Sequence, residues 1–299
     1  MDFAGQCAEI VQQTKLLAAA IDGADRTARV AACPDWNLAQ LLDHVRSGHR
    51  WAEKIVRTRA DHWLPDPALH HPNDTPPSAA ELIAGATTLA ATLLDAGPDA
   101  LVFTPVPAGP PRAAFYARRF MNETTIHRAD ATLAAGKDFT VSPNVTHDAM
   151  AEWLTLGSLT HSLAPGHRAL LGPGRTIHLS PTDHDTSWTV DLTGEALSWH
   201  PGPPSAAPST PTSDSTPSAK PSAPPTTATT LSATTTGDPT PSAKPSPPHT
   251  TPTPPSTATL SGSLTDLLLI VYRRLPVDTV RLTGDTAFLD RWLSTVGFG

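Results

Sequence analysis

The sequence predicts a bundle of long helices followed by a small α+β domain, which is interrupted by a disordered insertion rich in Pro, Thr and Ser. Three observations carry this prediction. Apolar residues recur at intervals of three and four through the first half of the chain, as on one face of a helix. After Pro165 they alternate with polar residues, as in a strand with one buried face. Residues 201–258 then hold 17 of the 33 prolines.

Each helix of the expected bundle after the first has its own start or stop signal. Asp35 or Asn37 can accept hydrogen bonds from the free N–H groups that open the second helix. Ser78 and Glu81 form a capping-box pattern ahead of the third, and Gly136 is placed to stop the fourth. A fifth helical pattern either completes the bundle or leads out of it. The expected helices span about 3–21, 38–59, 79–96, 113–135 and 146–163.

The alternating part of the chain is expected to build one α+β domain. Strand patterns stand on both sides of residues 201–258, so this segment interrupts one domain instead of separating two. Of its 58 residues, 50 are Pro, Thr, Ser or Ala, too few apolar groups to offset the entropy of ordering. The predicted domains are 1–163 and 164–299, with the insertion 201–258 at a hairpin tip of the second. Expected strands lie at 177–179, 188–192, 197–199, 257–261 and 280–283, and expected helices at 264–271 and around 288–292.

The composition argues against several classes of function. Lys and Arg number 21 against 28 Asp and Glu, a formal charge of −7 without a basic run, so nucleic acid is not an expected partner. No basic stretch leads into an apolar segment near Met1, and no window of about 18 uninterrupted apolar residues occurs, so we expect a cytoplasmic protein that does not enter a membrane. Cys7 and Cys33 lack CxxC spacing and are expected to be reduced structural thiols.

The candidate metal ligands come from the expected fourth helix. Glu123 and His127 are four residues apart and share one face, and Asp130 can accept a hydrogen bond from the second ring nitrogen of His127. His44 or His49 on the expected second helix can supply a further ligand. Two imidazoles and one carboxylate would leave an open position on zinc for a thiolate or water, and non-haem iron accepts the same ligand types. The same spacing also occurs in ordinary Glu–His pairs on helix surfaces.

Other catalytic patterns are absent or ambiguous. The sequence has no GxSxG, no P-loop, no GxGxxG after a strand and no Cys with a suitable helix dipole and base, so nucleophilic catalysis by Ser or Cys is not expected. Arg273 and Arg274 close an expected helix ahead of Pro276, where cations favour the negative end of the helix dipole. Either guanidinium is also suited to bind a substrate carboxylate.

Several stretches resemble the mycothiol-dependent maleylpyruvate isomerase family. They are Ala32–Asn37, Leu41–Val45 and His49–Ala52, then Arg118–Ala131, and towards the C-terminus Asp266–Leu269, Tyr272–Pro276 and Gly284–Leu293. The resemblance extends over essentially everything except the insertion. It implies a DinB-like four-helix bundle that holds a divalent metal, followed by a small sterol-carrier-like α+β domain.

The resemblance also implies a ligand set. The ligand pattern of the family falls on His44, Glu123 and His127, with His49 as the second choice. One departure is Asn122, where relatives often carry His, and this change is expected to alter the pocket without removing the metal.

The implied chemistry is that of a metal-activated thiol, with zinc as the expected ion and mycothiol as cosubstrate. In the type reaction the thiol adds to the double bond of maleylpyruvate, the new single bond rotates, and elimination gives fumarylpyruvate. Other members would transfer the thiol to other small-molecule electrophiles. Arg273 or Arg274 would hold a substrate carboxylate. The alternative is a non-catalytic metal- or ligand-binding bundle in which the insertion acts as an interaction tether for a partner that the sequence does not identify.

Overall fold

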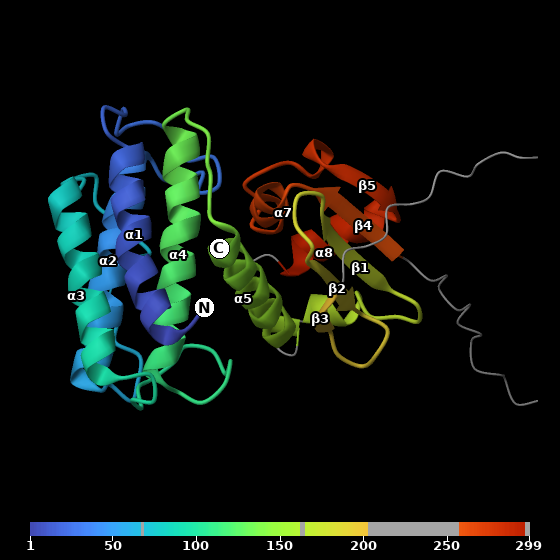
Figure 1. Ribbon diagram of the computed structural model, residues 1–299, viewed down its shortest axis with the longest axis horizontal. Helices are drawn as coiled ribbons and strands as arrows, with labels where there is room; N and C mark the ends of the chain where they lie inside the picture. The colour runs from blue at the N-terminus through green and yellow to red at the C-terminus, as the bar shows by residue number, and fades with distance from the viewer. Residues whose placement is uncertain (67–68, 162–164, 203–256, 297–299) are drawn as a thin grey trace, which may run out of the picture. The chain divides into compact units, whose positions relative to one another are not determined.

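The computed structural model describes residues 1–66, 69–161, 165–202 and 257–296. It confirms the predicted fold class, because four N-terminal helices form a bundle and a mixed five-stranded sheet with helices follows (Figure 1). The four bundle helices are α1 (Phe3–Ala20), α2 (Leu38–Thr58), α3 (Ala79–Ala96) and α4 (Ala113–Ala134).

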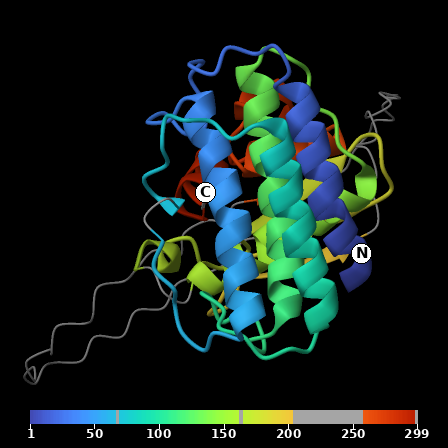
Figure 2. The same cartoon turned by 90° about the vertical axis from the view of Figure 1, so that its left-hand side faces the viewer.

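The bundle helices lie side by side (Figure 2), with α1 in contact with α3 and α4, and α2 in contact with the same two helices. The local sequence sets their ends. Asn37 and Ser78 each complete a capping box at the start of α2 and α3. Gly136 follows α4 with a φ of +68°, a conformation that glycine adopts without steric cost. Large buried side chains fill the interior, among them Ile10, Leu41, Ile55, Leu89 and Tyr116.

The fifth helix, α5 (Pro143–His161), leads out of the bundle. Four of its buried residues belong to the apolar cluster of the α+β domain, and the ring of Trp153 meets that of Trp292 edge to face with centroids 5.2 Å apart. Packing therefore groups α5 with the second domain, although α5 also contacts α4. The predicted division into 1–163 and 164–299 assigned this helix to the first domain, and the predicted boundary itself lies outside the described residues.

The sheet has the strand order β3-β2-β1-β4-β5, in which β1 and β4 run parallel and the other neighbours antiparallel. Ile177 pairs with Val190 on the buried face, whereas His178 pairs with Thr189 on the opposite face, as the two-residue period requires. The strands are β1 (Thr176–Pro181), β2 (Ser187–Asp191), β3 (Ser198–Gly202), β4 (Thr257–Gly262) and β5 (Arg281–Gly284). The helices of this domain are α6 (Pro165–Arg168), α7 (Leu264–Val271) and α8 (Thr286–Val296), with a short 3-10 turn at Val277–Thr279.

The ends of the predicted insertion 201–258 are strand, which corrects its boundaries by two residues at each side. Pro201 of β3 pairs with Trp188 of β2, and Ala258 of β4 pairs with Ile177 of β1. Pro201 fits because β3 is the edge of the sheet, where a strand has an open side that needs no N–H donor. Ala258 is buried in the same apolar cluster as the neighbouring strands. The prediction of a hairpin tip is wrong, because the flanking strands β3 and β4 are not neighbours in the sheet. The rest of the predicted insertion, residues 203–256, lies outside the described residues.

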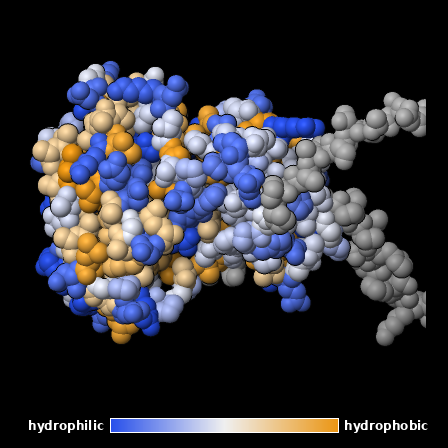
Figure 3. All heavy atoms as spheres, viewed as in Figure 1, coloured by the Kyte–Doolittle hydropathy of each residue, from blue (hydrophilic) through white to orange (hydrophobic). Residues whose placement is uncertain are grey.

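Within the described part of the chain, α3 is long and apolar enough to cross a membrane by length and composition. Five of its residues, from Leu82 to Leu93, are buried, and the helix contacts both α1 and α2. Apolar residues on the visible face of the bundle are interspersed with hydrophilic ones (Figure 3). A helix packed in a bundle meets the same criterion as a membrane span, so the criterion by itself assigns no membrane role to α3.

Candidate metal centre

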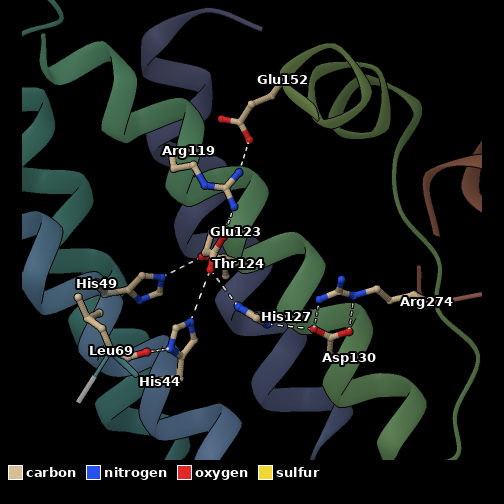
Figure 4. Close-up of polar contacts among 10 residues, drawn as sticks. All are labelled: His44, His49, Leu69, Arg119, Glu123, Thr124, His127, Asp130, Glu152 and Arg274. Carbon is tan, nitrogen blue, oxygen red and sulfur yellow. Dashed lines mark hydrogen bonds and ion pairs between the residues drawn. The ribbon is translucent and has the colours of Figure 1, made fainter. Parts of the chain in front are cut away.

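The bundle brings the three predicted ligands together. Glu123 and His127 project from the same face of α4, one turn apart, and Nε2 of His127 lies 3.0 Å from Oε1 of Glu123. His44 reaches the same carboxylate oxygen from α2, with its Nε2 at 3.5 Å. Figure 4 shows the two imidazoles pointing at the Glu123 carboxylate from different helices. The carboxylate oxygen therefore stands at the centre of the cluster.

Hydrogen bonds at the far side of each ring fix which nitrogen faces the cluster. Nδ1 of His44 lies 2.8 Å from the carbonyl oxygen of Leu69, which can only accept, so Nδ1 carries the hydrogen. Nδ1 of His127 donates in the same way to Oδ2 of Asp130 at 3.0 Å, as the sequence predicts. Each neutral ring then presents the lone pair of Nε2 to the cluster. This arrangement is typical of ligating histidines, whose second nitrogen is held by a carboxylate or a carbonyl.

A buried ion pair supports Asp130 in turn. Nε of Arg274 lies 2.8 Å from Oδ1 of Asp130 and Nη2 lies 3.0 Å from Oδ2, so the guanidinium donates to both carboxylate oxygens in a bidentate pair. The two side chains are 3% and 0% exposed, respectively. Burial opposes the charge of Asp130, but hydrogen bonds from His127 and Arg274 outweigh it and lower the pKa of this carboxyl. The ring of His127 is therefore held by a carboxylate that is charged at neutral pH.

Arg119 orients the carboxylate of Glu123 from the other side, a role that the sequence analysis missed. Nη2 of Arg119 donates to Oε2 of Glu123, and Nη1 donates to Oε2 of Glu152 on α5. Because Oε2 is engaged, Oε1 is the Glu123 oxygen that faces the imidazoles. The four-residue spacing from Arg119 to Glu123 was a usable signal for the first contact. No local pattern points to Glu152, which is 33 residues away in sequence.

A divalent metal fits this donor set. One ligand atom from each of His44, Glu123 and His127 lies within 4.8 Å of the others. Donors at the usual distances from a tetrahedral zinc ion lie about 3.3 Å from one another. The two distances from Oε1 of Glu123, 3.0 Å and 3.5 Å, bracket that value. Two nitrogens and one carboxylate oxygen are also the donors that zinc accepts in sites with an open position.

The electrostatics of the cluster describe its protonation when no cation is bound. Burial disfavours a charged His127, but the carboxylates of Glu123 and Asp130 outweigh burial and raise its pKa to about 9. Burial likewise disfavours the Glu123 carboxylate, and the charges of Arg119 and His127 reverse this and hold its pKa well below the usual range. A proton on His127 therefore supplies part of the positive charge that a bound cation would supply.

Two other sequence candidates are placed elsewhere. His49 is buried on α2, and its Nε2 lies 2.8 Å from Oγ1 of Thr124 instead of near Glu123. Burial lowers the pKa of His49 to about 4, so the ring is neutral at pH 7. Asn122, expected to alter the pocket, is fully buried with its amide directed at Asp148 and does not line the cavity beside the cluster.

Arg273 and Arg274 separate in the structure. Arg274 lines the cavity beside the metal ligands, but its guanidinium is engaged with Asp130. Both arginines line a second hollow, and the guanidinium of Arg273 donates to the carbonyl oxygen of Leu293. Substrate binding by either residue stays a prediction, and the geometry places only Arg274 near the candidate site.

A cavity of about 570 Å³ opens beside the three ligands. Its lining combines the metal-binding groups with residues of α2, α4, α5 and the loops between the helices. Cys33 also lines it, and burial raises the pKa of this thiol to about 11, so Cys33 is a thiol at neutral pH. The cavity therefore gives a small molecule access to the open side of the cluster.

The comparisons with known proteins agree with this geometry for the bundle. Residues 7–132 match the family model described as the mycothiol maleylpyruvate isomerase N-terminal domain, and this segment contains all three candidate ligands. Comparison with curated proteins and with solved structures returns no significant match. The sterol-carrier-like description of the second domain stays a prediction. The bundle is therefore similar, over residues 7–132, to the mycothiol maleylpyruvate isomerase N-terminal domain family.

Proposed function

We propose that the protein is an enzyme that uses a divalent metal, with zinc as the best match, to activate the thiol of mycothiol for attack on an electrophilic small molecule. The reaction is either cis–trans isomerisation of an activated double bond, as in maleylpyruvate, or transfer of the thiol to the electrophile. The observation that carries the proposal is the convergence of His44, Glu123 and His127 beside a cavity. The family of the bundle supports mycothiol as the thiol.

A bound divalent cation would supply one thing, the stabilisation of a thiolate relative to its thiol at neutral pH. The residues of the chain prepare the place for it. Once His127 has lost its extra proton, His44 and His127 each present a lone pair, because Leu69 and Asp130 hold their other ring nitrogens. Arg119 holds Oε2 of Glu123, so this side chain offers one oxygen and leaves room for a further donor from the cavity.

Neither of the two reactions needs an oxidant or a reductant. In isomerisation the sulfur bonds to one alkene carbon, and the π electrons move to the neighbouring carbon, where an adjacent carbonyl stabilises them. Rotation about the new single bond and loss of the same thiolate restore a double bond of opposite geometry. In transfer the sulfur–carbon bond is kept, and a leaving group departs or a proton is taken up. The proton of the thiol goes to solvent in both reactions.

Metal content tests the site directly. Plasma mass spectrometry on protein purified without a metal affinity column should find about one divalent ion per wild-type chain and almost none in His127→Ala. The matched control is His62→Ala, because His62 is 73% exposed, pairs with Asp61 and lies outside the cluster. This control should bind metal like the wild type.

Turnover tests the reaction. The metal-loaded protein should accelerate loss of an electrophile only when mycothiol is present, and His44→Ala and Glu123→Ala should abolish the acceleration. Absence of metal in the wild type even after reconstitution, or unchanged turnover in both variants, would overturn the proposal. Thiol-independent binding of a ligand without turnover would instead support the non-catalytic alternative.

A further inference from the structure

The cavity beside the metal ligands has a composition that selects one class of substrate. Resting on the proposed function, we infer that the electrophile taken by this site is an uncharged molecule with a flat aromatic body, and that dicarboxylates such as maleylpyruvate are poor substrates. The inference follows from three features of the cavity: the partners of its cations, the shape of its wall and its charge balance.

The first feature is that the cations at the cavity are already paired. Among the described residues that line it, Arg119 and Arg274 are the guanidinium groups, and no lysine is present. Arg119 donates to Glu123 and Glu152, and Arg274 donates to both oxygens of Asp130. A substrate carboxylate would have to displace one of these partners. Displacement would leave a buried carboxylate without its counter-ion, which is strongly unfavourable.

The imidazoles offer no substitute for a free cation. His44 and His127 face the Glu123 carboxylate, and Nε2 of His49 is engaged by Thr124. His70 stands exposed at the edge of the cavity, where water screens any charge that it carries. The described lining therefore contains no buried, unpaired positive group that would hold a carboxylate.

The second feature is an aromatic wall of the cavity. It consists of Trp51, Trp63, Phe115, Tyr116 and Phe120, all of which line the cavity. The ring centroid of Trp51 lies 4.9 Å from that of Trp63 and 5.8 Å from that of Tyr116, and Tyr116 stacks on Phe120 at 6.2 Å. The rings thus pack against one another in one continuous cluster that borders the cavity. Trp63 is 41% exposed and sits at the solvent side of it.

The polar atoms of Trp51 and Tyr116 are bound by backbone carbonyl groups. Nε1 of Trp51 donates to the carbonyl oxygen of Leu64 at 2.7 Å. The hydroxyl of Tyr116 donates to the carbonyl oxygen of Phe103 at 2.9 Å. What these two side chains present to the cavity is therefore ring carbon. Ring carbon favours apolar and aromatic ligands through burial and stacking, and it leaves a carboxylate without hydrogen bonds.

The third feature is the charge balance of the filled site. A bound divalent cation would be neutralised by the Glu123 carboxylate together with one thiolate. Arg119 and Arg274 are balanced by Glu152 and Asp130. An uncharged electrophile would keep the filled site neutral, whereas a dicarboxylate would add two buried negative charges.

Binding of two unreactive ring compounds tests the inference apart from catalysis. Methyl 3,5-dinitrobenzoate and 3,5-dinitrobenzoate share one ring and differ by one negative charge. Calorimetric titration of the full chain, both metal-free and loaded with zinc and mycothiol, should show the ester binding at least about tenfold more tightly. Equal or tighter binding of the carboxylate, or no binding of the ester, would overturn the inference.

Turnover of the corresponding chlorides separates this inference from the proposed function. Mycothiol sulfur bonds to the ring carbon of methyl 4-chloro-3,5-dinitrobenzoate, the carbon–chlorine bond breaks, chloride leaves and the thiol proton goes to solvent. Relative to the uncatalysed rates, kcat/KM should be at least about tenfold higher for this ester than for the free acid. Equal turnover of the acid, or efficient turnover of maleylpyruvate, would overturn the inference while leaving the metal and thiol chemistry intact. If the protein holds no metal, the proposed function fails and the metal-free titration still decides the inference.

Variants at the exposed end of the wall provide the residue-level test. Trp63→Ala should weaken binding of the ester by about three- to tenfold through loss of one stacking face, with little effect on the acid. Trp63→Arg should reduce the preference for the ester by placing an unpaired cation at the cavity. Leu94→Ala is the control, because Leu94 is 52% exposed on α3 and does not line the cavity. Unchanged ester affinity and unchanged preference in both Trp63 variants would contradict the assigned role of the wall.

Discussion

Replacement of Asp130 by Asn separates metal binding from fold stability in a way that tests the supporting contacts of the site. Asn keeps the shape of the side chain but removes the charge that Nδ1 of His127 and the guanidinium of Arg274 both contact. Loss of a partner that orients a ligating histidine typically lowers metal affinity by about 10- to 100-fold, which corresponds to about 1.4–2.8 kcal/mol. We expect Asp130→Asn to weaken zinc binding by that amount.

The same substitution should also destabilise the protein. Arg274 is 3% exposed and would lose its only carboxylate partner among the described contacts. Removal of one member of a buried ion pair costs about 3–5 kcal/mol in unfolding free energy. The double variant Asp130→Asn with Arg274→Met removes both charges, so it should recover most of the stability but none of the metal affinity.

Two assays read the two effects separately. Zinc affinity is measured by competition with a chromophoric chelator, and unfolding free energy by urea titration of the metal-free protein. If the folded single variant binds zinc within about twofold of the wild type, the contact from Asp130 to His127 does not support the ligand. If the double variant recovers zinc affinity along with stability, the loss in the single variant came from the fold and not from the ligand.

Further predictions concern protons and packing. His127 must lose a proton when metal binds, and its pKa is about 9. Zinc affinity should therefore rise by about tenfold per pH unit from pH 7 towards 9. Calorimetry in buffers of different ionisation enthalpy should find about one proton released per zinc ion bound. The pKa of His127 is higher in the folded protein than its unfolded value of about 6.5, so this residue stabilises the metal-free fold fully below pH 6.5 and loses that effect as the pH rises through about 9. Urea titrations should therefore show the unfolding free energy falling across that window in the wild type but not in His127→Gln. Trp153→Ala empties a fully buried site against Trp292 and should cost about 3–5 kcal/mol in urea unfolding, and a loss below about 1 kcal/mol would contradict the packing of α5 on the second domain.

The helices were predictable from sequence because their signals are local. The capping boxes at Asn37 and Ser78 and the glycine after α4 fix helix ends through contacts within a few residues. The predicted division places the fifth helix in the first domain, although a helical period does not say which domain its apolar face packs against. The predicted insertion wrongly includes Pro201, because proline is accepted in a strand at the edge of a sheet and the sequence does not show that β3 is such an edge.

In the candidate metal site, too, local contacts could be predicted from the sequence and long-range contacts could not. Spacing along α4 was enough to group Glu123, His127 and Asp130, whose contacts are one turn long. The choice between His44 and His49 needed the resemblance, since both lie on α2 and spacing does not separate them. Contacts from Glu152 to Arg119 and from the backbone of Leu69 to His44 span long sequence distances or involve no side-chain pattern. They depend on tertiary packing, which a single sequence does not display.

X-ray absorption at the metal edge tests the central claim most directly. The zinc-loaded protein should show nitrogen and oxygen neighbours alone, and addition of mycothiol should introduce one sulfur neighbour at about 2.3 Å. The same experiment on His127→Ala should show no zinc bound in the site. A zinc-loaded protein whose spectrum is unchanged by mycothiol would contradict the claim that His44, Glu123 and His127 hold a metal in order to activate a thiol.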